Sequence, residues 1–215
     1  VEAVASHGHT VFHQPSKKLS LQIGNGWALH AACGIPVIND FRMLDVQLGG
    51  QGAPLVPIGD KLLFGEYDYC INLGGIANIS MESGGNRIAF DICPFNLLLN
   101  HFAEACGKSY DKNGKLAKKG KLLKKELAQL NKLPYYQIEG AKSLGREDLE
   151  GYLKILKMSS DMKPENILHT LVIHFVDQIN KILIPVPGRK TKVLVTGGGA
   201  FNKFFIEKLE ASLEP

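Results

Sequence analysis

The sequence predicts an α/β protein, in which short apolar strands alternate with amphipathic helices. Residues 164–183 give the clearest helix, because Ile167, Leu171 and Phe175 recur at the spacing of one helix face. Residues 192–213 read as a buried strand, a triple-glycine turn and a second helix. Strands and helices that alternate along one chain are typical of the α/β class.

The first 40 residues predict short elements separated by turns. Residues 2–12 indicate a strand that enters a glycine-containing turn, and Leu19–Ile23 indicates a second strand. Trp27–Cys33 is predicted to be a short helix that Gly34 ends, since glycine is common just after a helix C-terminus. Residues 35–40 are rich in β-branched side chains, which favours a third strand.

The middle of the chain predicts a loop followed by three strands. Glycines and prolines punctuate residues 46–59, so this stretch is predicted to be a loop. Strands are predicted over 67–72, 76–81 and 87–92, and the sequence ESGGN at 82–86 fits a hairpin turn between the last two.

The lysine-rich stretch at residues 112–132 has two possible interpretations. It holds eight lysines, and a basic stripe can bind nucleic acid. However, Leu123, Leu127 and Leu130 recur at helical spacing, and no aromatic side chain lies among the lysines to stack on bases. An amphipathic helix with a solvated face is therefore favoured, and no nucleic-acid partner is expected. Further helices are predicted over 96–106 and 148–156.

Composition places the chain among ordinary globular proteins. Its 215 residues are 45% hydrophobic and 21% charged. No apolar run approaches the roughly 20 residues that span a bilayer, so no membrane partner is expected. No signal peptide is visible, and the four cysteines form no CxxC pair, which predicts a reduced, mostly buried set in a cytoplasmic protein. The chain starts at Val1 without Met, which suggests a piece of a longer protein.

Two glycine-rich turns are candidates for binding an anion or a nucleotide. In INLGGIANIS (71–80), Gly74 and Gly75 interrupt apolar residues at the tip of a hairpin, where backbone can approach phosphate oxygens. In VLVTGGGAFN (193–202), a strand, a glycine turn and a helix N-terminus follow one another, an arrangement that suits phosphate. Each turn alone also fits ordinary packing, but the two together favour a nucleotide.

Acid–base and metal candidates are few. Asp40, Asp45 and Asp91 follow or end predicted strands, where an aspartate is either a helix cap or a general base. The histidines in SHGHTVFH (6–13) do not have a standard ligand spacing, so no metal site is expected there.

Several segments, in order along the chain, together resemble one family. The segments are SHGHT (6–10), LQIGN (21–25), DFRMLDVQLGGQGAPLVP (40–57), NLGGIAN (72–78), FDICPFN (90–96), KSLGRE (142–147) and VTGGGAFN (195–202). This pattern resembles the anhydro-N-acetylmuramic acid kinases, and GGQGAPLVP is very specific to them. The resemblance implies an actin-like ATPase (ribonuclease H-like) fold of two α/β domains. It also implies that ATP and water convert 1,6-anhydro-N-acetylmuramic acid to its 6-phosphate during cell-wall recycling.

The resemblance assigns roles by position. It implies that Asp91 is the catalytic base and that Mg²⁺ accompanies ATP. The implied nucleotide-binding residues are Gly74, Gly75, Asn78, Gly197, Gly198, Gly199 and Asn202. The implied sugar-facing residues are His7, Gln22, Asp40 and Arg42. Family likeness also suggests a homodimer.

The sequence departs from the family pattern in several places. Met43 and Leu44 replace two arginines, and CPFN at 93–96 replaces a G-P-G-N run, which removes two glycines close to Asp91. A first phosphate loop of the form GTSxDG is absent from the sequence. The chain is therefore expected to hold a remnant of the first domain (1–38) and most of the second (39–215), to bind ATP weakly if at all, and not to turn over alone.

Two alternatives stay open. A non-catalytic nucleotide- or sugar-binding module on the same fold would account for the altered CPFN segment and the replaced arginines. A Rossmann dehydrogenase would account for GGGAFN, but it requires an acidic residue about 20 positions on and gives the Gly74-Gly75 hairpin no role.

Overall fold

The computed structural model describes residues 1–52, 54–140, 142–145, 148–156 and 162–213. The chain forms two compact units, Val1–Gly59 and Asp60–Pro215. The division lies at a later residue than the domain boundary that the sequence suggested after residue 38. The assignment of residues 1–38 to a first domain remains a proposal.

The N-terminal unit consists of two small sheets and short helices. Its elements are β1 (Val4–Ala5), β2 (His9–Gln14), η1 (Pro15–Lys17), β3 (Leu19–Ile23), α1 (Gly26–Cys33), β4 (Val37–Ile38) and α2 (Met43–Gln47). Strand β1 pairs in parallel with β4, and β2 pairs antiparallel with β3. The Asn25 side chain accepts hydrogen bonds from Trp27 and Ala28 at the start of α1, and Gly34 ends this helix with a φ of 70°. These two caps confirm the predicted helix.

The loop is shorter than the predicted range 46–59, so the prediction is wrong at both ends. Helix α2 extends to Gln47, and α3 (Val56–Leu63) begins before residue 59. Pro57 did not prevent α3, since proline is tolerated in the first helical turn, where its missing N–H has no partner in any case. The backbone turns at Gly49 and Gly52, whose φ values are 96° and 62°.

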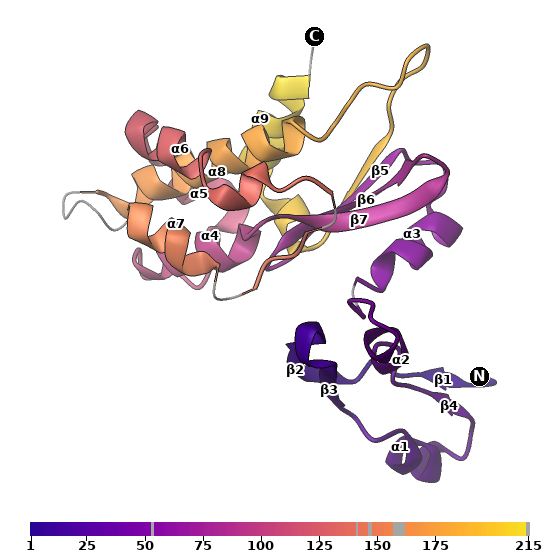
Figure 1. Cartoon of the computed structure of the whole chain (residues 1–215). Coiled ribbons are helices and arrows are strands. Elements are labelled where there is room, and N and C mark those ends of the chain that lie inside the picture. Colours follow the sequence, from indigo (N-terminus) through magenta and orange to yellow (C-terminus); the bar gives the residue numbers. More distant parts are fainter. Residues whose placement is uncertain (53, 141, 146–147, 157–161, 214–215) are drawn as a thin grey trace. The chain divides into compact units, whose positions relative to one another are not determined.

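The C-terminal unit is built on one mixed sheet (Figure 1). Its strands are β5 (Tyr69–Leu73), β6 (Ala77–Ser83), β7 (Asn86–Cys93) and β8 (Val193–Thr196), in the spatial order β7-β6-β5-β8. The β5–β6 and β6–β7 pairs are antiparallel, whereas β8 lies parallel to β5. Gly84 and Gly85 form the β6–β7 turn with positive φ, which confirms the hairpin predicted from ESGGN.

Helices pack against one face of this sheet (Figure 1). The helical elements are α4 (Phe95–Glu104), η2 (Lys112–Gly114), α5 (Lys115–Lys119), α6 (Lys124–Leu130), η3 (Pro134–Gln137), α7 (Leu149–Leu156), α8 (Pro164–Asn180), η4 (Gly198–Phe201) and α9 (Lys203–Leu213). Alternate sheet residues, among them Ile71, Leu73 and Ile79, are at most 1% exposed and share a core with α4, α8 and α9. The mixed α/β class and the long helix beginning at Pro164 are confirmed.

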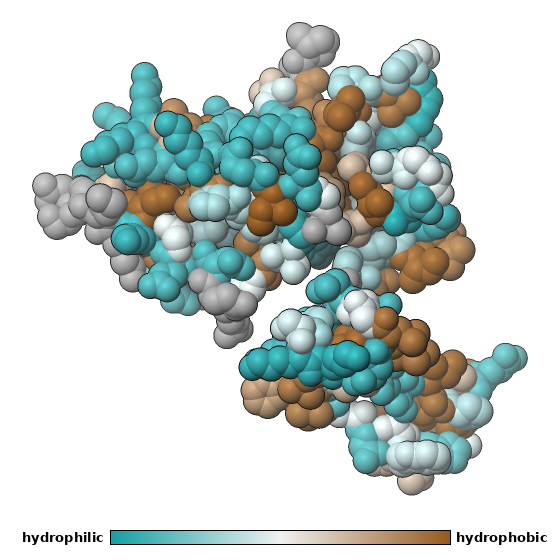
Figure 2. Space-filling model, in the orientation of Figure 1, coloured by the Kyte–Doolittle hydropathy of each residue, from teal (hydrophilic) through white to brown (hydrophobic). Residues whose placement is uncertain are grey.

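The lysine-rich stretch forms two short helices, α5 and α6, instead of one. The break is at Gly120, where a Cβ atom would lie 2.0 Å from the main-chain oxygen of Glu165 at the start of α8. This close approach lets Asn166 and Thr170 accept the amides of Lys121 and Leu123. The lysines face solvent, as the sequence predicted, and hydrophilic side chains cover this part of the surface (Figure 2).

Two further expectations can be compared with the structure. Cys70 and Cys93 are buried, but Cys33 is exposed and Cys106 is half-buried, so the prediction of a mostly buried set holds for two of the four. In the described part of the chain, no helix is both long and apolar enough to cross a membrane.

The CPFN segment supplies core side chains. Cys93 and Phe95 are fully buried, and neither residue has a positive φ. The Phe95 ring lies 5.2 Å from the Phe175 ring and 4.8 Å from the Phe205 ring, measured between centroids. Loss of the two glycines found in the family pattern is therefore compatible with a regular backbone beside Asp91.

The Phe95 cluster gives a testable prediction for stability. Replacing Phe95 with alanine should lower the free energy of unfolding by about 3–5 kcal/mol, because it leaves a cavity among aromatic rings. Phe201, which is 78% exposed, is the matched control, and its alanine variant should change stability by less than about 0.5 kcal/mol. Denaturant unfolding followed by circular dichroism measures both. Equal losses in the two variants would show that Phe95 is not a core anchor.

Candidate active site

The tip of the β5–β6 hairpin has glycines that its own packing does not require. Neither Gly74 nor Gly75 has a positive φ, and Gly75 is exposed. A Cβ atom at Gly75 would lie 3.4 Å from its nearest neighbour, Leu97 Cγ, and one at Gly74 would also be 3.4 Å from its nearest atoms. Because such contacts are tolerable, the fold does not explain why both residues are glycine. The two adjacent glycines leave room for another molecule to approach the backbone.

The start of α4 holds the hairpin in place. The Asn96 amide nitrogen donates to the main-chain oxygens of Leu73, at 3.1 Å, and Gly74, at 2.8 Å. The Leu97 amide donates to the oxygen of Gly75 at 3.0 Å. The hairpin carbonyls are thus directed toward α4. Within the described residues, no acceptor receives the Gly74 or Gly75 amide, so both N–H groups are available to an anion.

The three glycines after β8 have different physical roles. Gly197 has a φ of 82°, and a Cβ atom there would lie 2.5 Å from Asn72 Oδ1. At Gly199 it would lie 2.5 Å from Cε1 of Phe95, so packing requires glycine at both positions. At Gly198 no atom lies within 4 Å of an added Cβ. Only Gly198 is left unexplained by the fold.

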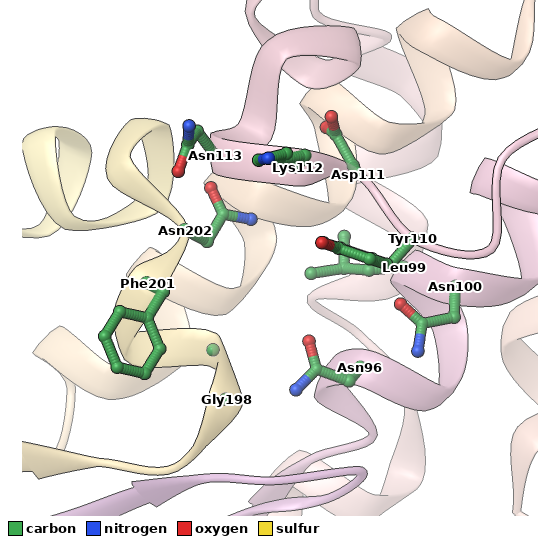
Figure 3. A pocket seen from close by; sticks show the side chains of 11 residues that line it. Asn96, Leu99, Asn100, Tyr110, Asp111, Lys112, Asn113, Gly198, Phe201 and Asn202 are labelled. Atoms are coloured by element: carbon green, nitrogen blue, oxygen red, sulfur yellow. The ribbon is translucent and has the colours of Figure 1, made fainter.

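A pocket of about 180 Å³ lies beside Gly198 and brings together residues from three parts of the chain. Gly198, Phe201 and Asn202 line one side, and Asn96 and Tyr110 line the other (Figure 3). It joins the predicted turn at 197–202 to the start of α4. The contribution of Asn96 was not predicted, although it is the last residue of the CPFN segment.

Two asparagines present polar atoms of fixed identity to this pocket. Asn202 Oδ1 accepts from the Phe205 amide at 3.1 Å, so its Nδ2 is the free end. Asn96 is oriented the other way, because its Nδ2 is bound to the hairpin carbonyls and its Oδ1 is free. Figure 3 shows the Asn202 nitrogen and the Asn96 oxygen pointing into the pocket. The pocket therefore offers one donor and one acceptor whose orientation the protein itself determines.

Asp91 lies near the end of β7, on the sheet that carries both glycine turns. Strand pairing puts Asp91 opposite Asn78, Asn78 opposite Asn72, and Asn72 opposite Thr196. Residues that are directly paired across neighbouring strands project from the same face. These polar residues therefore form one row across the sheet, and the apolar residues in between face the helices.

The Asp91 carboxylate does not cap a helix. Helix α4 begins only at Phe95, and no side chain caps it. Instead, Asp91 Oδ2 accepts a hydrogen bond from the Leu144 amide at 2.9 Å. Burial raises the pKa of the Asp91 carboxyl above its ordinary value, while the Leu144 hydrogen bond acts in the opposite direction. A half-buried carboxylate with a raised pKa has the properties of a general base.

In the N-terminal unit, three of the four residues expected to face a sugar lie together. The Arg42 guanidinium is 2.9 Å from His7 Nε2, and the Gln22 amide nitrogen donates to the main-chain oxygen of His7 at 2.9 Å. Gln22 Oε1 is buried and has no hydrogen-bond partner in the described residues. Asp40 is exposed with a φ of 57°, and no hydrogen bond joins it to this group in the described residues.

The different roles of the glycines predict different effects on stability. Gly199→Ala should lower the free energy of unfolding by about 1–3 kcal/mol, because the new methyl group overlaps Phe95 and Leu73. Gly198→Ala and Gly75→Ala should stay within about 0.5 kcal/mol of the unmodified chain. Denaturant unfolding of the three variants measures this difference. A large loss for Gly75→Ala would mean that packing, after all, requires glycine at the hairpin tip.

Comparison with known proteins identifies the family of this chain. A family model described as anhydro-N-acetylmuramic acid kinase matches residues 1–215. Kinases of that name from Aliivibrio fischeri, Hydrogenovibrio crunogenus and Idiomarina loihiensis are 37%, 35% and 35% identical to this chain. The alignments cover 99%, 99% and 100% of this chain but 60%, 60% and 61% of the respective relatives, so the chain spans about three fifths of their length. The chain belongs to the anhydro-N-acetylmuramic acid kinase family.

Proposed function

We propose that the whole protein phosphorylates 1,6-anhydro-N-acetylmuramic acid with ATP while water opens the anhydro bridge. The observation that supports this proposal is the pairing of Asn78 with Asp91, because it puts the proposed base on the strand next to the exposed glycine hairpin. Family membership supports the choice of substrate and of phosphorylation, since relatives that match nearly all of this chain are named anhydro-N-acetylmuramic acid kinase. The product is N-acetylmuramic acid 6-phosphate.

Asp91 is the proposed catalytic base. Its carboxylate takes a proton from a water molecule as the water oxygen attacks the anomeric carbon of the sugar. The bond between that carbon and the bridging oxygen breaks, and the freed O6 attacks the γ-phosphorus of ATP. The bond from this phosphorus to the β,γ-bridging oxygen breaks, and ADP leaves. A raised pKa suits this role, because a base works best when its pKa is near the working pH.

The two glycine turns are proposed to bind ATP within an actin-like fold. Gly74 and Gly75 offer main-chain N–H groups to phosphate oxygens, with Asn78 beside them. The pocket next to Gly198 is proposed to hold the adenosine, with the Asn202 nitrogen and the Asn96 oxygen as polar contacts. Gly197 and Gly199 contribute by giving the turn its shape.

Mg²⁺ is proposed to be bound chiefly by the phosphates of ATP. The described residues contain no group of three or more His, Cys, Asp or Glu side chains that could hold a metal ion. In kinases, Mg²⁺ is commonly bound by substrate phosphates and only one or two carboxylates, so it does not require a group of three protein ligands. When bound, the ion neutralises charge on the phosphates.

The sugar is proposed to contact the group formed by His7, Gln22 and Arg42, with Asp40 as a further contact. The contacts of Gln22 and Arg42 with His7 support this assignment, because they bring three polar side chains of the N-terminal unit together. The 215-residue chain by itself is proposed to bind ATP weakly and not to turn over. For the whole protein we propose a cytoplasmic location and a homodimer.

A substitution at Asp91 tests the catalytic proposal. In the full-length protein, Asp91→Asn should lower kcat by about 10²–10⁴-fold, because asparagine cannot take the proton. Stability at pH 7 should be equal or higher, since burying an amide costs less than burying a charge. A coupled assay of ADP release measures turnover. The control is Asp68→Asn, which removes a carboxylate paired with Arg189 and should leave kcat unchanged.

The raised pKa of Asp91 predicts the direction in which stability and kcat change with pH. The pKa of Asp91 is higher in the folded chain than in the unfolded chain, so ionising it costs stability between these two pKa values. Asp91→Asn should therefore gain stability relative to the unmodified protein as pH rises through that window. The acidic limb of kcat should have its midpoint above the ordinary aspartate pKa of about 3.9. Full activity of Asp91→Asn would instead favour a different base. No turnover by the unmodified full-length protein would favour a non-catalytic binding module.

Alanine variants at the open glycines test nucleotide binding. Gly75→Ala and Gly198→Ala in the full-length protein should weaken ATP binding by about tenfold or more, equivalent to about 1.4 kcal/mol, because each methyl group occupies space proposed for the ligand. Gly151→Ala is the control, since its new methyl group would make only ordinary contact with Leu133. Calorimetric titration with a non-hydrolysable ATP analogue gives the dissociation constants. Unchanged affinity in both test variants would place the nucleotide elsewhere.

A further inference from the structure

The segment from Lys142 to Leu144 lies along β7 and holds Asp91 directly. The Asp91 amide donates to the main-chain oxygen of Lys142 at 3.0 Å, and the Leu144 amide donates to Asp91 Oδ2 at 2.9 Å. Leu144 is only 7% exposed, so its side chain anchors the segment in the unit. Residues 146–147 of the KSLGRE sequence lie outside the described residues.

Tyr135 contacts Asp91 from a second direction. Its hydroxyl donates to the main-chain oxygen of Asp91 at 2.7 Å. The Lys142 ammonium lies 4.9 Å from the centre of the Tyr135 ring and donates to the main-chain oxygen of Ile138 at 3.0 Å. Tyr135 and the Lys142–Leu144 segment are therefore connected to each other as well as to Asp91.

Helix η3 carries both Tyr135 and Tyr136, and Tyr136 belongs to a buried hydrogen-bond network. The Tyr152 hydroxyl lies 2.6 Å from the Tyr136 hydroxyl, which lies 2.9 Å from His174 Nε2. His174 Nδ1 lies 2.6 Å from Asn131 Oδ1. Burial lowers the pKa of His174 to about 3, so the ring is neutral at pH 7.

The donor and acceptor in each hydrogen bond of this network follow from the partners of Asn131. Gln178 donates to Asn131 Oδ1, which makes that oxygen an acceptor, so Nδ1 of the neutral His174 ring carries the proton. His174 Nε2 then accepts from Tyr136, and Tyr136 accepts from Tyr152. Each of the four side chains in this network therefore has a hydrogen-bond partner, and a fully satisfied buried network is rigid.

We propose that Tyr135 is a positioning residue for the base and that the base acts through Oδ1. The main-chain N–H, the main-chain oxygen and Oδ2 of Asp91 are all occupied, by Lys142, Tyr135 and Leu144 respectively. Oδ1 is the remaining polar atom, and no donor reaches it within the described residues. The proton released by the attacking water goes to Oδ1 while Leu144 keeps Oδ2 in place. This inference depends on the proposed role of Asp91.

A matched pair of tyrosine variants tests this proposal. The Tyr69 hydroxyl also donates to a main-chain oxygen, that of Ile184 at 3.0 Å, but it does not contact Asp91. Tyr135→Phe removes one hydrogen bond, whereas Tyr69→Phe removes two, because the Tyr69 hydroxyl also accepts from the Ile184 amide at 3.2 Å. Tyr69→Phe should therefore lower the melting temperature at least as much as Tyr135→Phe. In the full-length protein, only Tyr135→Phe should lower kcat, by about tenfold, with KM for both substrates within about twofold.

The pH profile separates positioning from a general loss of stability. Only Tyr135→Phe should displace the acidic limb of kcat. It should move to higher pH, because a loosened Leu144 amide no longer favours the ionised carboxylate. Matching kcat values and pH profiles for Tyr135→Phe and Tyr69→Phe would overturn the inference. If Asp91→Asn keeps its rate, the proposed function itself fails. If Asp91→Asn is inactive but the two tyrosine variants behave alike, only the positioning role fails.

A measurement that does not depend on activity uses the 215-residue chain. In the unmodified chain, the amide resonance of Leu144 should shift with pH as Asp91 ionises, since the two groups share a hydrogen bond. The shift should be absent in Asp91→Asn, smaller in Tyr135→Phe and unchanged in Tyr69→Phe. A Leu144 amide that does not respond to the ionisation of Asp91 would exclude the proposed contact.

Discussion

The register between β6 and β7 is the constraint on which the site depends. Ala77 pairs with Cys93 and Asn78 pairs with Asp91, so Ile92 is an extra residue on β7 between the two pairs. Because of this irregularity, Cys93 enters the core while Asp91 stays on the polar face. A shift of one residue would exchange the two faces of a strand, burying the carboxylate against the helices and exposing apolar side chains. The burial of Ala77 and Cys93, both 0% exposed, therefore specifies where the Asp91 carboxylate lies.

Packing requires glycine at some positions of the two loops and leaves glycine unexplained at others. Gly197 and Gly199 are glycine because neighbouring atoms of Asn72 and Phe95 occupy the space of a side chain. At Gly75 and Gly198 a methyl group would fit without a serious clash. The two open positions lie on separate loops, the hairpin tip and the turn after β8. Asn96 links them, because it binds the hairpin carbonyls and also lines the pocket beside Gly198.

Local patterns predicted much of this fold, and contacts between distant residues account for what they missed. The β6–β7 hairpin and the helix beginning at Pro164 follow from short-range signals, namely paired glycines and apolar periodicity. The break between α5 and α6 depends on the approach of Glu165 to Gly120, which no local pattern reveals. The strand-end position of Asp91 made it one of three acid–base candidates, and the family resemblance then selected it. Tyr135 lies 44 positions further along the chain and could not be linked to Asp91 without coordinates.

Phe95 shows how a departure from the family pattern can be accommodated. A side chain at this position requires space, and the missing side chain of Gly199 provides it, since an added Cβ would lie 2.5 Å from the ring. Phe175 and Phe205 enclose the rest of the ring. The next residue, Asn96, holds the hairpin, so the core residue and the residue that positions the loop are adjacent in one helical turn. The ring of Phe95 thus packs against the turn after β8, and the adjacent Asn96 holds the hairpin. For the nucleotide binding proposed above, such preorganised loops would lower the entropy cost.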